Sequence, residues 1–366
     1  MRSIIVGIVI GCVIGVMFGA TIIAPRLENT GNNGTASLGQ AIKQAARAIA
    51  PENTVALPLA GAQKTVERWR MASAYPASLP LLGKLASRLG RNLWNVSDGG
   101  LELKFYEPGS LVPVKGMFDA VSSGAIDSAF GTVDIWANKA PALNLFAAIP
   151  FGPEADEYLA WLYFGDGQKS LNEIYGKFNV HGIVCGMIPA QASGWFRRKF
   201  NAPEDLQGLN MSTSGLGALV LSKLGVSPKY VEEEDLLVAY ENGEIEAFEF
   251  SLPSVDLQMG FGDFANHYYF PGWQQPAAFF NLIINKDIWD RLSKSRQAQI
   301  EAVCGENVIQ GLAEGESLQY GALRKMAAKG VKIHRWPESI LAALRDAWKK
   351  VQTEQSAADQ DFDRIW

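Results

Sequence analysis

The chain has 366 residues, 48% of them hydrophobic and 19% charged, so it is long enough for two folded domains and too apolar for a disordered protein. The net charge of −5 and the lack of a basic stripe with interleaved aromatics argue against a nucleic-acid-binding protein. The three histidines have no metal-ligand spacing, and no dinucleotide-binding, P-loop or serine-hydrolase motif is present, so the motifs favour a binding protein over an enzyme.

The chain begins with an apolar segment, residues 1–24, that carries no charge from Ile4 to Ala24. Its length is about that needed to cross the core of a bilayer, and glycines recur at every fourth position, as in close-packed membrane helices. No clean cleavage site with small residues stands out. We predict that residues 4–24 are an uncleaved anchor that tethers an exported, periplasmic protein to the inner membrane. The alternative is a signal segment that is removed.

Residues 25–65 are predicted to be a linker, because glycine, asparagine, serine and threonine dominate its first half. A short helix fits residues 38–49. The folded body then runs from residue 66 to residue 366, and we predict that it forms two discontinuous α/β lobes.

The folded body opens with alternating strands and helices. Strands are predicted at 66–73 and 101–106, with a helix at 79–89 between them. Apolar side chains recur at helical spacing around 114–121, and the strand that follows ends near Phe130. This alternation predicts an α/β fold with largely parallel sheets.

A helix–glycine–strand unit occurs twice, at 120–130 and at 239–249. An alanine, a glycine, an isoleucine and an acid fall in the same register in both copies, with the glycines at Gly124 and Gly243. Glycine suits the left-handed position that ends a helix. We interpret the copies as two similar lobes around one cleft, with ligand-binding residues at the strand ends. The alternative is a chance likeness between two ordinary units.

The remaining elements complete the lobes and form a helical tail. The strand of the second unit is predicted at 245–250, with a break at Pro253. Further strands are predicted at 180–187, 279–284 and 331–334, and a turn followed by a strand at 204–211. Further helices are predicted at 156–164, 168–178, 216–224, 288–309, 312–329 and 337–351. We expect the C-terminal helices to pack against the lobes; the alternative is that they form a homodimer interface.

Three cysteines, Cys12, Cys185 and Cys304, lack the spacing of a metal site. Since Cys12 lies in the apolar N-terminal segment, the folded body holds at most one disulfide. We predict that Cys185 and Cys304 are buried free thiols, because free cysteine behaves as a small hydrophobic residue.

Aromatic and polar residues gather at predicted strand ends and loops, which is the mixture that a small-solute site needs. They are Tyr75, Trp136, Trp195, Glu249, Phe250, Trp273 and Gln274. For Trp195 and Trp273, the alternative that the side chain packs in the core has the same weight as a role in the site. Four consecutive acids at 232–235 are interpreted as a solvated helix start rather than a metal site.

Six short motifs follow one another between residues 66 and 345. They are Trp69-Arg70-Met71-Ala72-Ser73, Leu111-Val112-Pro113 with Asp119–Gly124, Pro150-Phe151-Gly152, Gln191 with Gly194-Trp195-Phe196-Arg197, Asp205–Met211, and Tyr268–Trp273. The series resembles the DctP-type solute receptors of TRAP (tripartite ATP-independent periplasmic) transporters. Within that family it is most similar to the branch that binds 2-oxo and hydroxy monocarboxylates.

The resemblance implies a two-lobed, type II-like periplasmic solute-binding fold, with hinge strands and a long connecting helix, that closes over a small organic acid. It implies no catalytic residue and no cofactor. A cation, sodium or calcium, is expected against Gln191, Glu249 and the main-chain carbonyl of Phe250, since oxygen ligands suit a hard cation. The expected substrate-binding residues are Ser73, Tyr75, Trp136, Gln191, Ser212, Phe250 and Gln274.

The chain departs from the family at Ser212, where most members carry an arginine that clamps the substrate carboxylate. One hydroxyl here replaces a planar fork of donors. Two compensations are open. In the first, the hydroxyls and free N–H groups of residues 212–214, which precede a helix, hold the anion. In the second, the ligand is not a carboxylate, or its acid group binds only through the cation. Glu249-Phe250 also replaces the Glu-Trp pair of this branch, which removes an indole N–H.

The resemblance therefore implies an extracytoplasmic receptor that captures a small organic acid or a related polar solute by lobe closure. Its partners would be the membrane permease subunits of a TRAP transporter. An anchor departs from the usual released form of the family and would keep the receptor near its permease. The alternatives are a ligand-sensing module without transport and, from a different class, an exported enzyme acting on a small acid.

Overall fold

The computed structural model describes residues 66–366, which lie within one compact unit, Lys64–Trp366. The predicted anchor at 1–24 and the predicted linker at 25–65 lie outside the described residues. Among the residues that are described, no helix has both the length and the apolar character to span a bilayer.

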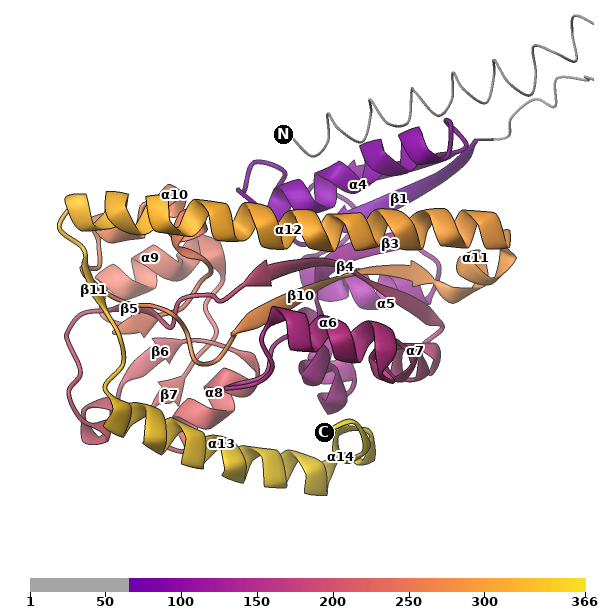
Figure 1. The fold of residues 1–366 in the computed structure, drawn as a ribbon. Coiled ribbons are helices and arrows are strands. Elements are labelled where there is room, and N and C mark those ends of the chain that lie inside the picture. Colours follow the sequence, from indigo (N-terminus) through magenta and orange to yellow (C-terminus); the bar gives the residue numbers. More distant parts are fainter. Residues whose placement is uncertain (1–65) are drawn as a thin grey trace, which may run out of the picture. The chain divides into compact units, whose positions relative to one another are not determined.

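Lobe 1 is built on a five-stranded sheet (Figure 1). In spatial order its strands are β2 (Leu101–Tyr106), β1 (Glu67–Ser73), β3 (Ser128–Thr132), β10 (Ala277–Asn285) and β4 (Val180–Pro189). β1 is parallel to both of its neighbours, whereas β10 is antiparallel to β3 and to β4. The predicted strands are confirmed, but the sheet is mixed rather than largely parallel, because β10 returns to lobe 1 from lobe 2.

Lobe 2 is built on a six-stranded sheet of short strands. In spatial order they are β11 (Lys332–His334), β9 (His267–Tyr269), β5 (Gly194–Phe196), β8 (Ala247–Phe248), β6 (Asn210–Ser212) and β7 (Ser227–Pro228). β6 is parallel to β7 and β8, and β5 is antiparallel to β8 and β9. The prediction of a strand over 245–250 is too long, because only β8 pairs with neighbours on both sides.

Helices cover both sheets. Those of lobe 1 are α4 (Leu82–Val96), α5 (Met117–Ser122), α6 (Ala155–Phe164) and α7 (Gly167–Gly176), with the 3-10 helices η2 (Val114–Gly116), η3 (Val133–Lys139) and η4 (Pro141–Phe146). Those of lobe 2 are α8 (Gly215–Ser222), α9 (Glu233–Glu241) and α10 (Pro253–Met259), with η5 (Pro203–Leu206) and η6 (Phe261–Asp263). Pro253 was predicted as a break, but it begins α10, where a missing N–H costs nothing.

The two helix–glycine–strand units lie in different lobes, as the sequence pattern predicts. α5 ends just before Gly124 and leads to β3, and α9 ends just before Gly243 and leads to β8. Both glycines have a positive φ, 76° and 77°, which is the left-handed conformation that glycine adopts readily at a helix end. Each unit thus delivers its strand to the sheet of its own lobe.

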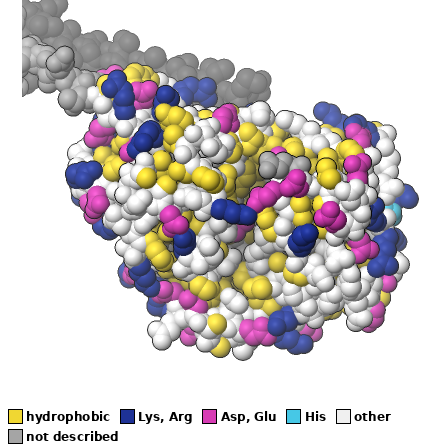
Figure 2. Space-filling view, turned by 180° about the vertical axis from the view of Figure 1, so that it is seen from behind, with side chains coloured by type: hydrophobic (Ala, Val, Ile, Leu, Met, Phe, Trp, Pro, Cys, Tyr) yellow, Lys and Arg dark blue, Asp and Glu magenta, His cyan; other side chains and the backbone are white. Residues whose placement is uncertain are grey.

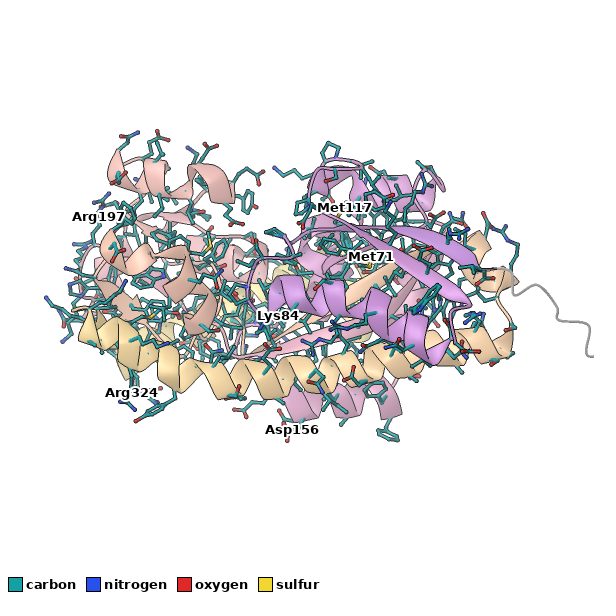
Figure 3. All side chains as sticks on the ribbon, turned by 90° about the horizontal axis from the view of Figure 1, so that it is seen from above. Met71, Lys84, Met117, Asp156, Arg197 and Arg324 are labelled. Carbon is teal, nitrogen blue, oxygen red and sulfur yellow. A yellow bond between two sulfur atoms is a disulfide. The ribbon has the colours of Figure 1, made fainter. Side chains whose placement is uncertain are left out.

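One long helix, α12 (Lys294–Ala328), runs along both lobes; in Figure 3, Met71 and Met117 mark lobe 1 and Arg197 marks lobe 2. The prediction of two helices, 288–309 and 312–329, is wrong. A short α11 (Lys286–Arg291) precedes a helix that continues through Gly311. A Cβ at Gly311 would lie 2.3 Å from the carbonyl oxygen of Met187, so this glycine lets α12 pack closely on β4 instead of ending it.

The C-terminal helices pack on their own chain, as expected. α13 (Glu338–Ala358) lies against α8 of lobe 2, and α14 (Gln360–Ile365) contacts η4 of lobe 1. Trp348 and Trp366 meet edge to face, with ring centroids 5.4 Å apart. The tail therefore crosses from one lobe to the other.

Cys185 and Cys304 form a disulfide between β4 and α12, so the prediction of free thiols is wrong. Their Cα atoms are 4.1 Å apart. The two cysteines meet because α12 lies along β4, a contact between segments 119 residues apart that sequence spacing does not reveal. Disulfides persist in oxidising compartments, which agrees with the predicted export. Cys12 lies outside the described residues.

A buried carboxyl organises the interior of lobe 2. Asp256 of α10 is 0% exposed, and its Oδ2 accepts hydrogen bonds from the indole of Trp195 and the hydroxyl of Tyr268, each at 3.0 Å. Its Oδ1 accepts from the N–H of Ser251 at 3.1 Å. Burial raises the pKa of Asp256 to about 7, and these three donors oppose that shift. Trp195 is therefore a core residue.

We expect Asp256→Asn to destabilise the protein by about 1–3 kcal/mol, because an amide group would turn an N–H toward a donor in place of an acceptor. The free energy of unfolding from urea denaturation at pH 8 measures the effect. Asp346→Asn is the control, since that side chain is 70% exposed. Equal stability of the two variants would contradict the role of the Asp256 network.

Candidate functional site

The two lobes meet at a cleft, and the ends of parallel strands from both lobes point toward it. β1 and β3 of lobe 1 end at Ser73 and Thr132, and β6 of lobe 2 ends at Ser212. At one end of the cleft, Lys115 Nζ of lobe 1 lies 2.5 Å from Glu232 Oε1 of lobe 2. Figure 2 shows a hollow on this face with hydrophobic side chains in it and charged side chains around it. Open α/β sheets bind ligands at such strand ends.

Hydroxyl groups lie at the strand ends on the lobe 1 side of the cleft, although Ser73 itself is 0% exposed. Ser73 Oγ donates to the carbonyl of Tyr75 at 2.7 Å and accepts from its N–H at 3.1 Å, which fixes the turn after β1. The Tyr75 hydroxyl lies 2.9 Å from Thr132 Oγ1, at the end of the neighbouring strand β3. Burial, and next the Asp134 carboxyl, raise the pKa of Tyr75 above its ordinary value, so its hydroxyl stays protonated.

The lobe 2 side of the cleft presents the carboxyl of Glu249. This residue follows β8 directly, and its N–H donates to the carbonyl of Ser212 at 3.1 Å. Burial raises the pKa of Glu249 to about 7, and the nearby Asp134 carboxyl adds to that shift. No ion pair within residues 66–366 compensates Glu249. The cleft therefore holds a partly buried carboxyl that a bound cation would stabilise.

Two glutamines lie on the segments that cross between the lobes. The N–H of Gln191 donates to the carbonyl of Gln275 at 3.1 Å, and the carbonyl of Gln191 accepts from Gly272 at 2.7 Å. A Cβ at Gly272 would lie 2.8 Å from both the Gln191 carbonyl and the Gln274 side-chain oxygen, so only glycine allows this approach. The crossing segments thereby hold Gln191 and Gln274 next to the strand ends of lobe 2.

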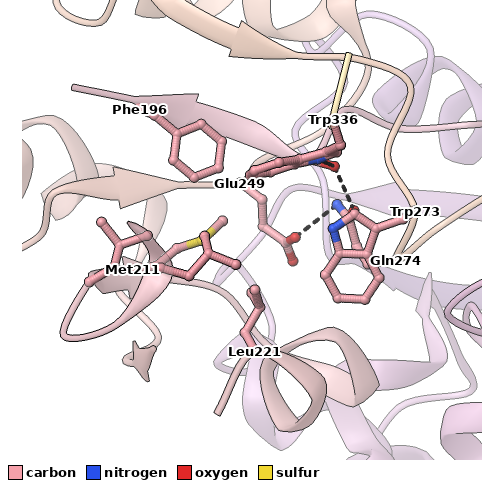
Figure 4. Close-up of a pocket in the computed structure, with 10 residues that line it drawn as sticks. Phe196, Met211, Leu221, Glu249, Trp273, Gln274 and Trp336 are labelled. Carbon is pink, nitrogen blue, oxygen red and sulfur yellow. Dashed lines mark hydrogen bonds between the residues drawn. The ribbon is translucent and has the colours of Figure 1, made fainter. Parts of the chain in front are cut away.

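A chain of hydrogen bonds connects the start of the C-terminal tail to Glu249 (Figure 4). The indole of Trp336 donates to Ser193 Oγ at 2.8 Å, and Ser193 Oγ lies 3.3 Å from Gln274 Oε1. Gln274 Nε2 donates to the Ala192 carbonyl at 2.7 Å and to Glu249 Oε2 at 2.9 Å. An indole N–H only donates, so Ser193 must donate onward, and the amide of Gln274 is oriented with its N–H groups toward Glu249.

A small cavity lies behind this chain within lobe 2. Glu249 and Gln274 form its polar side, and mainly apolar residues form the rest. The lining residues are Ser193, Phe196, Leu206, Leu209, Met211, Leu221, Glu249, Trp273, Gln274 and Trp336. Its volume of about 10 Å³ is close to the smallest that holds one water. A solute would therefore have to contact Glu249 from the side of the cleft.

Three further predicted residues lie close to Glu249. Phe250 packs its ring edge-on against Phe261, with centroids 5.2 Å apart, so its main-chain carbonyl is its available polar group near the cleft. Ser212 Oγ accepts from the N–H of Val231 at 3.2 Å. The neighbouring Thr213 Oγ1 lies beside the Glu249 carboxyl and lowers its pKa, but within the described residues it has no partner in hydrogen-bonding geometry.

Two predicted aromatic residues belong to the packing of the molecule. Trp136 is 1% exposed, and its indole donates to the hydroxyl of Tyr175 at 2.9 Å, so its only polar group is already bonded inside lobe 1. Trp273 stacks on Phe151, with ring centroids 5.4 Å apart. The sequence brought Trp136 into the site because it follows a strand end, but its side chain turns into the core.

Sequence reasoning missed Asp134, the second residue of η3, which lies two residues after β3 ends. Burial raises its pKa, while hydrogen bonds from the Thr132 side chain and from the main chain oppose the shift. The carboxyl of Asp134 also raises the pKa of Tyr75 and of Glu249, so it lies near both sides of the cleft. The available signal was an acid a few residues after a predicted strand of an α/β lobe.

Comparisons with known proteins give one consistent result. The family model of the bacterial extracellular solute-binding proteins, family 7 (DctP), matches residues 72–359. A monocarboxylate 2-oxoacid-binding periplasmic protein of Nostoc sp. is 30% identical over 300 residues, which is 82% of each chain.

Solved structures agree with this match. A TRAP transporter solute-binding protein from Bordetella bronchiseptica, solved with copurified calcium and picolinate, is 35% identical over 82% of this chain and 90% of that one, with a TM-score of 0.79. A TRAP periplasmic solute-binding protein from Pseudoalteromonas atlantica, solved with sodium and pyruvate, is 30% identical over 82% of this chain and 92% of that one, with a TM-score of 0.77.

Proposed function

Because the chain belongs to the DctP family of bacterial extracellular solute-binding proteins, we propose that it is the solute receptor of a TRAP-type transporter and binds a small organic acid in its cleft. Members of this family bind solute without converting it, so the alternative of an exported enzyme is dropped. The observation that carries the proposal is the partly buried Glu249 at the strand ends of lobe 2, within hydrogen-bonding distance of Gln274. Relatives solved with a cation and a carboxylate support it.

Gln191, Glu249 and the main-chain carbonyl of Phe250 are the proposed ligands of a calcium or sodium ion. They supply the carboxylate and carbonyl oxygens that such hard cations take. Glu249 has no ion-pair partner among residues 66–366, and a cation would relieve the cost of ionising it in a partly buried position. The cation would supply a positive charge to the solute carboxylate.

The proposed solute contacts are Ser73, Tyr75, Gln191, Ser212, Phe250 and Gln274. Ser212 stands where the family's arginine clamp would be, and its hydroxyl keeps a proton to donate while its oxygen accepts from Val231. The neighbouring Thr213 hydroxyl is buried beside the Glu249 carboxyl. Trp136, the seventh predicted contact, would act only by supporting lobe 1 from its core.

The test is a binding titration of the purified full chain by isothermal calorimetry, after removal of metal by a chelator. We expect a small 2-oxo, 2-hydroxy or 2-amino acid to bind in the presence of calcium or sodium, with one site per chain and no product. Absence of binding to every acid with either cation would refute the proposal, and turnover would assign the protein to a different class.

We expect calcium affinity to depend on pH through Glu249. The cation binds the ionised carboxylate, and a proton must leave whenever the pH lies below the raised pKa of about 7. Affinity should therefore be roughly tenfold weaker at pH 6 than at pH 8. A glutamate with an ordinary pKa would stay ionised over this range and would give no such change. Calorimetric titration at both pH values, in buffers of equal ionic strength, measures the calcium affinity.

The family is extracytoplasmic, and the permease subunits of a TRAP transporter are the proposed partners. We retain the anchor at residues 4–24 as a proposal; fractionation of cells into membrane and periplasmic fractions would test it. A homodimer through the C-terminal helices is also only a proposal, and light scattering of the purified chain would test it.

A further inference from the structure

The cleft carries a second acid that the proposed cation site does not use. Asp134 is the second residue of η3, two residues beyond the end of β3, and Thr132 connects it to Tyr75, two residues beyond the end of β1. Glu249 of lobe 2 likewise follows a strand end, one residue beyond β8. The two carboxyls thus sit at strand ends that face one another across the cleft.

No positive side chain balances these two acids. Neither Asp134 nor Glu249 has an ion-pair partner within residues 66–366. Lys139, at the other end of η3, lies 2.7 Å from Asp119, and Lys115 lies 2.5 Å from Glu232. Ser212 supplies no charge. The described part of the cleft is therefore a site of net negative charge.

A solute that is only an acid leaves this charge uncompensated. A divalent cation at Glu249 balances that carboxylate and the carboxylate of the solute, and a sodium ion balances less. Asp134 then remains as a partly buried charge, which is costly unless it is paired. A positive nitrogen on the solute would remove the cost.

The groups around Asp134 suit an ammonium group. An ammonium has three donors and no acceptor. The lobe 1 edge offers the Asp134 carboxylate and the hydroxyl oxygens of Thr132 and Tyr75, which lie 2.9 Å from each other. A charge-assisted hydrogen bond to the carboxylate would be the strongest of these contacts.

We infer that the cleft takes a small zwitterion, with its carboxylate at the cation beside Glu249 and its ammonium group at Asp134. This inference rests on the proposed function, because it uses the same cleft and the same cation. It makes Asp134 the residue that distinguishes a 2-amino acid from the 2-oxo acid of the same carbon skeleton.

The test compares matched pairs of solutes on the full chain with calcium: alanine against pyruvate, and 2-aminobutyrate against 2-oxobutyrate. We expect each amino acid to bind at least about tenfold more tightly than its oxo partner. Asp134→Asn should remove most of that preference by weakening the amino acids. Asp119→Asn, a more exposed acid of lobe 1, is the control and should keep the preference.

The wild-type ratio decides the inference even if a variant fails to fold. Binding of pyruvate as tightly as alanine, in both pairs, would overturn the zwitterion and leave the proposed receptor function intact. An amino-acid preference that survives in folded Asp134→Asn would overturn the role of Asp134. Failure of all four solutes with calcium and with sodium, while another small acid binds, would overturn the inference and leave the receptor function intact.

Discussion

Replacing Glu249 with glutamine is expected to weaken calcium binding by about a hundredfold or more. Loss of a group that merely supports a metal ligand costs about 10–100-fold in affinity, and Glu249 is proposed as the charged ligand itself. Glutamine keeps the shape and one oxygen but removes the charge that attracts the cation. Calorimetric titration of calcium at pH 8 would measure the change.

The same variant should be at least as stable as the wild type without calcium. Burial raises the pKa of Glu249 to about 7, so at pH 8 its ionisation opposes folding, and an uncharged side chain removes that penalty. Loss of calcium binding with an unchanged or higher melting temperature therefore separates a binding effect from misfolding. Glu246→Gln, three residues earlier, is the matched control. Calcium binding of equal strength in both variants would place the cation elsewhere.

Removal of the disulfide by Cys185→Ala with Cys304→Ala is expected to lower the free energy of unfolding by about 4–5 kcal/mol. The bond closes a loop across a sequence separation of 119 residues and so restricts the unfolded chain strongly. For a chain of this size the melting temperature should fall on the order of 10 °C. Differential scanning calorimetry of the full chain, with Cys12 kept in every sample, measures the loss.

Reduction gives an independent check on the disulfide. A reductant should lower the melting temperature of the wild type and leave that of the double variant unchanged. Equal melting temperatures for oxidised wild type and double variant would contradict a stabilising bond. Stabilisation by calcium should persist in the double variant, since the disulfide joins β4 to α12 and no proposed ligand lies on either element.

The sequence predicted most elements of lobe 1 because local patterns encode them, but it missed the short β5, β7 and β9 and the helix α10 of lobe 2. Alternating side chains gave the limits of β2, and an acid-rich start with a stop at Gly243 indicated α9. Gly124 and Gly243 marked helix ends, and both adopt the expected left-handed conformation. The resemblance added a family, which the comparisons bear out.

The wrong predictions concern residues that can take either of two structural roles, depending on the elements around them. Helices were predicted separately at 288–309 and 312–329, but α12 is continuous there, and Gly311 permits its close contact with Met187. Pro253 read as a stop, but it starts α10. Trp136 read as a site residue, and its indole bonds to Tyr175 in the core. The residue type is compatible with both uses, and only the neighbouring elements choose between them.

By itself, the sequence determined the α/β class and the order of the strands and helices that it predicted. These depend on residue type and on spacing over a few positions. Tertiary structure alone decided the pairing of Cys185 with Cys304, the orientation of Gln274 toward Glu249, and the approach of Asp134 to Glu249. Each joins segments far apart in the chain, and their distance is set by how the lobes pack, which no local pattern records.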